Sequence, residues 1–66
     1  MQENDVVLIK SINSDYNNYY GQIKLKGRDS FNVKIFNRKN IYGFYEDNVY
    51  KVFKEYDLIK ISKEHK

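Results

Sequence analysis

The chain has 66 residues, enough for one domain, and it contains no cysteine, which excludes disulfides, thiolate metal sites and cysteine nucleophiles. Its formal net charge of +3 suits nucleic acid or an acidic partner without selecting either of them. With 7 Tyr, 4 Phe, many Val and Ile, and no alanine, the composition favours an all-β fold over a helical bundle.

The N-terminal part is expected to contain one strand and one long loop. Residues 6–12 begin with four apolar side chains in succession, which is typical of a strand covered on both sides or of one that twists across a barrel seam. Residues 11–20 are polar and rich in tyrosine, and they form a loop too long for a tight turn. Because proline is absent, turns must come from Gly, Asn, Asp and Ser.

A second strand is expected to begin at Gly21 and to run to residue 26. A glycine at this point indicates a sharp bend or the close approach of another backbone. In the pattern that follows, Ile23 and Leu25 are predicted to share one face of the strand. Lys24 and Lys26 are predicted to share the other.

Residues 31–48 read as a hairpin. Phe31, Val33 and Ile35 alternate with polar residues, the period of a strand with one buried face. Residues 37–40 are turn-prone and charged, and residues 41–45 return to aromatic and β-branched side chains around a glycine. We therefore expect two strands joined by a charged turn.

The C-terminal third is less regular. Residues 46–48 can form one helical turn, and residues 49–53 a short closing strand. In residues 54–63, isoleucines alternate as in a strand, but apolar residues three apart also fit a helix. We favour the strand because β-branched residues dominate, and we expect residues 62–66 to be a tail outside a core of about 5–61.

Five or six short antiparallel strands, with a one-turn helix before the fifth, predict a small closed barrel, because closure removes unpaired strand edges. Its core is expected around Val33, Ile35, Phe44 and Val52. The succession VVLIKS, a glycine before QIKL, FNVKIF, YGFYEDN and VYKV resembles the SH3-like small barrels over residues 5–53. Within that group it is similar to KOW-type domains and to the E subunit of photosystem I. The resemblance implies an SH3-like barrel in a nucleic-acid-binding or protein-binding role.

Two kinds of side chain are candidates for a binding surface. Aromatic rings that can stack on bases or fill pockets in a protein partner are Tyr16, Tyr19, Tyr20, Tyr42 and Tyr45. Cations that can follow a phosphate backbone are Lys24, Lys26, Arg28, Lys34, Arg38 and Lys39. Each set has an ordinary structural alternative: tyrosines of the loop can fold back over the end of the barrel, and lysines on alternating strand positions keep a sheet soluble.

The sequence does not indicate an enzyme. The carboxylate pairs Glu46/Asp47 and Glu55/Asp57 have no accompanying base or nucleophile, and Glu46 and Asp47 suit a capping or turn role. His65, the single histidine, lies beside the end of the chain, which argues against a zinc site. We expect neither metal nor cofactor.

We therefore expect a small non-enzymatic binding module in the cytoplasm, since the sequence shows no signal peptide and no apolar run near the roughly 20 residues that span a bilayer. Its partner is nucleic acid, bound through basic strands and tyrosines, or alternatively a host protein that the module docks on and modulates. The chain is expected to be a monomer or a weak homo-oligomer that pairs through a strand edge in 54–63. Abundant residues with AT-rich codons are typical of a low-GC genome, a phage or a mobile element.

Overall fold

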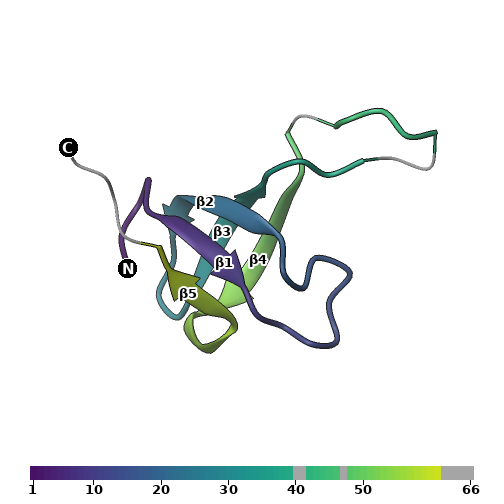
Figure 1. The fold of residues 1–66 in the computed structure, drawn as a ribbon. Coiled ribbons are helices and arrows are strands. Elements are labelled where there is room, and N and C mark those ends of the chain that lie inside the picture. The colour runs from purple at the N-terminus through teal and green to yellow at the C-terminus, as the bar shows by residue number, and fades with distance from the viewer. Residues whose placement is uncertain (40–41, 47, 62–66) are drawn as a thin grey trace.

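The computed structural model of the protein describes residues 1–39, 42–46 and 48–61. The strands are β1 (Val6–Ile9), β2 (Tyr20–Lys26), β3 (Ser30–Ile35), β4 (Tyr50–Lys54) and β5 (Leu58–Lys60), and one 3₁₀ turn, η1 (Glu55–Asp57), precedes β5. All neighbouring strands are antiparallel (Figure 1). The all-β prediction is confirmed. None of the described elements is a helix long and apolar enough to cross a membrane.

The five strands form one sheet in the order β4-β3-β2-β1-β5, so that β4 and β5 are its two edges. Although η1 joins these two strands in the chain, they pair with different neighbours, β3 and β1 (Figure 1). The sheet is therefore not closed, and the predicted closed barrel is wrong in this respect. The expected strand within 54–63 is confirmed as β5.

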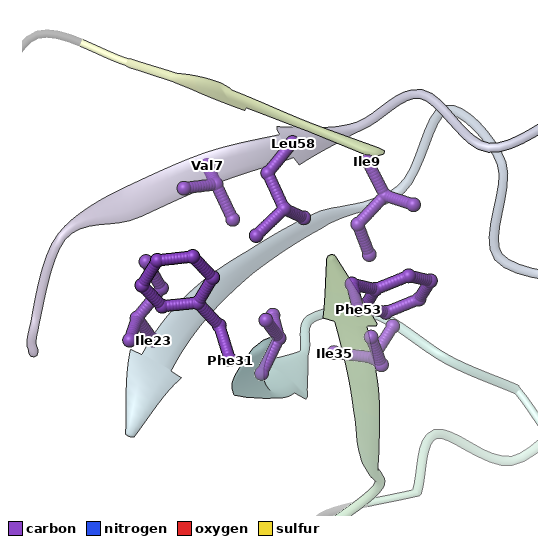
Figure 2. Packing of buried hydrophobic residues seen from close by; sticks show 8 residues of the cluster. Val7, Ile9, Ile23, Phe31, Ile35, Phe53 and Leu58 are labelled. Carbon is purple, nitrogen blue, oxygen red and sulfur yellow. The ribbon is translucent and has the colours of Figure 1, made fainter. Parts of the chain in front are cut away.

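Side chains from all five strands meet on one face of the sheet and form the core. They are Val7, Ile9, Ile23, Phe31, Val33, Ile35, Phe53 and Leu58, each at most 6% exposed (Figure 2). Burying one such side chain contributes roughly 1.5–3 kcal/mol, so these eight are the main source of stability.

Two of the four predicted core residues are correct and two are wrong. Val33 and Ile35 are buried, but Val52 is 60% and Phe44 71% exposed. In β4 the alternation has the opposite phase to the one expected. Phe53 lies opposite the buried Phe31 and points inward, which turns its neighbour Val52 outward.

A β-bulge in β2 overturns a second expectation, that Ile23 and Leu25 share a face. Ile23 pairs with Val33, and Leu25 pairs with Asn32, which is adjacent to Val33 in β3. Lys24 is therefore an extra residue without a partner in the register. The one-residue shift moves Leu25 to the outside, where it is 60% exposed.

Gly21 confirms the expected close approach of a second backbone. A Cβ atom at this position would lie 2.6 Å from the carbonyl oxygen of Lys34 and 2.6 Å from Cγ1 of Val33. No side chain fits there without displacing β3.

Asparagines make several of the turns in this proline-free chain. Asn4, Asn18, Asn37 and Asn48 have φ between +60° and +75°, the left-handed region that asparagine tolerates better than most residues. The expectation that turns come from small polar residues is confirmed at these positions.

The segment between β3 and β4 differs most from the prediction. Residues 42–45 form no regular strand, and an isolated bridge pairs Lys39 with Tyr45. A 3₁₀ turn at 55–57 confirms the expected one-turn helix before the fifth strand. The helical turn expected at 46–48 includes Asp47, which lies outside the described residues. The predicted tail, 62–66, with His65, also lies outside them.

Candidate functional site

The candidate site is the face of β2, β3 and β4 that points away from the core, which we call the outer face. By register it consists of Tyr20, Gln22, Leu25, Ser30, Asn32, Lys34, Tyr50, Val52 and Lys54, and Lys24 joins them through a hydrogen bond to Gln22. Gln22, Lys34 and Tyr50 lie side by side on adjacent strands, and Leu25, Asn32 and Val52 form a second such row. The site is therefore a sheet surface on which rings, amides and cations are mixed.

Two lysines lie at the centre of this surface. Lys34 lies between Gln22 and Tyr50 in the register. Lys24 is directed to the same side, because its Nζ donates a hydrogen bond to Oε1 of Gln22 at 3.4 Å. Lys26, which was expected beside them, lies opposite Phe31 after the bulge and so belongs to the core side of β2.

All charged residues of the five strands are positive. Their charged residues are Lys24, Lys26, Lys34, Lys51, Lys54 and Lys60, and none of the five strands contains Asp or Glu. The carboxylates of the described residues all lie in loops, turns and η1. No acidic neighbour on the outer face therefore neutralises Lys24 or Lys34.

Aromatic rings flank these lysines. Tyr20 and Tyr50 are each about half exposed on the outer face. Phe36 follows two residues after Lys34, and its N–H donates to the carbonyl oxygen of Tyr20 at 2.9 Å, which places it in register beside Tyr20. A hollow of about 190 Å³ lies between Tyr20 and Phe36. The sequence reasoning missed Phe36 and Tyr50, although the period of two in residues 34–36 pointed to Phe36.

The other two loop tyrosines have a structural role. Tyr16 and Tyr19 are partly buried against the core, and their rings meet edge to face with centroids 6.0 Å apart. The guanidinium carbon of Arg38 lies 5.5 Å from the centre of the Tyr16 ring. Hydrogen bonding with the side chain of Tyr16 is the main cause that raises the pKa of Arg38 above its usual value. These three residues connect the two long loops of the molecule.

We call the segment 37–48 the arm, and its described residues, 37–39, 42–46 and 48, project away from the sheet (Figure 1). Its base is held by a hydrogen bond from the Glu46 N–H to the carbonyl oxygen of Arg38 at 2.7 Å. Lys39 Nζ lies 5.0 Å from the centre of the Tyr45 ring. Tyr42, Phe44 and Tyr45 are all more than 60% exposed, so the arm presents three large rings to the surroundings.

The structure thus divides the predicted site residues into four places. Tyr20, Lys24 and Lys34 lie on the outer face; Lys39, Tyr42 and Tyr45 on the arm; Tyr16, Tyr19 and Arg38 between the two loops; and Lys26 and Arg28 at the turn from β2 to β3.

No protein-family model, curated protein or solved structure matches the chain. Within residues 1–39, 42–46 and 48–61, no group of three or more His, Asp or Glu side chains is placed to hold a metal ion.

Proposed function

We propose that this domain is a binding module without catalytic activity that binds single-stranded nucleic acid across its outer face. The observation that carries the proposal is the position of Lys24 and Lys34 on interior strands, with Tyr50 opposite Lys34 and Tyr20 on the same face, in strands without carboxylates. Lysines attract the phosphates, and the rings offer flat surfaces on which bases stack.

Lysines that keep a sheet soluble account for only some of the lysines in the strands. Lys51, Lys54 and Lys60 lie on the edge strands β4 and β5, where charged side chains prevent edge-to-edge aggregation. Lys24 and Lys34 lie on β2 and β3, whose edges are both paired. Protection of an edge does not account for these two, which favours a role in binding.

A single strand suits the outer face better than a duplex. Stacking on Tyr20 or Tyr50 requires a base whose flat face is accessible, and in a duplex those faces are covered by neighbouring base pairs. Tyr20 in β2 and Tyr50 in β4 lie two strands apart, roughly 10 Å at the roughly 4.8 Å spacing of a sheet, so both rings can stack on bases of one extended single strand.

The topology supports the finer assignment of the fold to the SH3-like group. The five antiparallel strands and the 3₁₀ turn before the fifth agree with the fold expected for that group, with η1 and β5 lying beyond residues 5–53, over which the sequence resemblance extends. Because that group includes both nucleic-acid-binding and protein-binding domains, the assignment is compatible with the proposed function but does not select it.

The proposal is tested by measuring the affinity for a labelled oligothymidine at several salt concentrations. Lys34→Gln should weaken binding and reduce the slope of log K against log salt by about 0.7, the value for one phosphate contact on a single strand. Tyr50→Ala should weaken binding by the 1–3 kcal/mol typical of one stacked base, roughly 5- to 150-fold.

Lys51→Gln is the matched control for Lys34→Gln. Lys51 lies opposite Val33 and so is on the other side of the same sheet, one strand away from Lys34. Its replacement removes the same charge and should change affinity little. Equal loss in both variants, or binding that does not respond to salt, would contradict the proposal.

The exposed rings of the arm support a second candidate, a protein-interaction module that docks on a host protein. Tyr42, Phe44 and Tyr45 are the type of large side chain that dominates interface energies. Replacing all three by alanine should then abolish capture of a protein from a nuclease-treated lysate, while Lys24→Gln with Lys34→Gln leaves capture intact. The reverse result, with capture dependent on the lysines and lost after nuclease treatment, favours the outer face.

A further inference from the structure

A cavity of about 610 Å³ opens at the end of the sheet where β2 turns into β3. It lies within the roughly 300–1,000 Å³ range of small-molecule sites. Phe31, nearly buried, forms an apolar part of its wall, together with Met1, which packs against the core. The remaining lining residues are Lys26, Gly27, Arg28 and Asp29 from the turn, and Lys54, Glu55 and Tyr56 from the end of β4 and η1.

Two of the cations that line this cavity, Lys26 and Arg28, are available to bind an anion. Lys54 Nζ lies 3.5 Å from Oδ2 of Asp29, so these two groups largely offset each other. Among the residues that the structure describes, neither Lys26 nor Arg28 forms an ion pair. Glu55 opposes one of them, and the lining as a whole keeps one positive charge. Cationic and apolar surfaces therefore lie next to each other in one hollow.

We infer that this cavity binds a small molecule in which a phosphate monoester is attached to a flat ring, the chemistry of a nucleoside monophosphate. Arg28 binds two phosphate oxygens with its fork of N–H donors, and Lys26 supplies a second charge. The ring packs against Phe31, and the exposed side chain of Tyr56 covers its other face. The outer face contributes none of these residues, so the inference does not depend on the proposed function.

Adenosine monophosphate is the probe for the experiment, and binding is followed by amide chemical shifts of the ¹⁵N-labelled protein. We expect saturable shifts in residues 26–31 and 54–56, the two segments that line the cavity. Adenosine lacks the phosphate and inorganic phosphate lacks the ring, so each should bind at least about tenfold more weakly than adenosine monophosphate. Lys26→Gln with Arg28→Gln should weaken adenosine monophosphate binding about tenfold or more.

A second double variant separates this site from general attraction to a basic protein. Lys10→Gln with Lys51→Gln removes the same charge outside the cavity, and its affinity should equal that of the unmodified protein. Equal weakening in both double variants would overturn the inference. Chemical-shift changes confined to the outer face would also overturn it. The same holds if binding does not saturate below about 10 mM, since a dissociation constant of that size corresponds to a binding free energy of only about 3 kcal/mol. All four replaced side chains are exposed, so the fold should persist in every variant.

Discussion

Phe53 and Phe44 occupy two regions that the local amino-acid pattern hardly distinguishes. Each phenylalanine lies among tyrosines and β-branched residues, in YKVFK and IYGFY. Yet Phe53 in β4 is 5% exposed, whereas Phe44 in the arm is 71% exposed. The difference lies in the pairing: Phe53 is opposite Phe31 across an antiparallel ladder, while Phe44 belongs to no strand and lies beside an isolated bridge between Lys39 and Tyr45.

This comparison teaches that an aromatic side chain is buried here only where its backbone belongs to the sheet. The sheet and the arm should then respond differently to equivalent substitutions. The sheet should lose stability, and the arm should lose contacts with a partner but retain the fold.

The largest contrast is expected between Phe53→Ala and Phe44→Ala. Phe53→Ala opens a cavity in the core and should lower the free energy of unfolding by about 3–5 kcal/mol. Phe44→Ala should change it by less than about 0.5 kcal/mol, as at other exposed positions. Urea denaturation followed by circular dichroism measures both. A large loss with Phe44→Ala would show that the arm is part of the cooperative fold.

The glycines provide a second pair. Gly21→Ala places a methyl group 2.6 Å from the backbone of β3 and from Val33, and we expect a loss of about 2 kcal/mol. Gly43→Ala in the arm meets no atom within 4 Å, and its φ of +86° is the only source of strain. Its cost should be about 1 kcal/mol, the lower end of the roughly 1–2 kcal/mol that a side chain costs in the left-handed region. The order is checked by thermal unfolding, and the reverse order would contradict the packing at Gly21.

Asp5 tests the sheet at its start, where a buried carboxylate joins two segments. Its Oδ2 accepts a hydrogen bond from the N–H of Gln2 at 2.9 Å and lies 3.6 Å from Nζ of Lys60 in β5. Asp5→Ala should lower stability by about 1–2 kcal/mol, since a hydrogen bond to a charged group is lost. The exposed Asp15 is the control, and Asp15→Ala should be nearly neutral in the same denaturation experiment.

The smallest effect is expected where the arm joins the loop of residues 10–19. Arg38→Gln removes the cation that lies over the Tyr16 ring. Hydrogen exchange should become faster at the amides of Tyr19 and Glu46, which are hydrogen-bonded in this region, and remain unchanged at Val33. Faster exchange at Val33 would mean that this contact supports the whole sheet.

Several features could be predicted from residues alone. Alternation in 31–35 identified the buried side of β3, because a strand with one covered face repeats every two residues. The glycine before the second strand was correctly associated with a close backbone approach, because only glycine lacks the atom that would collide. For the candidate site, Tyr20, Lys24 and Lys34 were named together and do lie on one face.

Other features depend on which residue lies opposite which, and this is decided only in the folded sheet. The bulge at Lys24 moved Leu25 outward and Lys26 to the core side, and the pairing of Phe53 with Phe31 turned Val52 outward. The same register placed Phe36 and Tyr50 beside the lysines. Local sequence predicted the strands because backbone preferences act over neighbouring residues, but the register arises from contacts between distant segments. For that reason only the tertiary structure separated the core, the outer face and the arm.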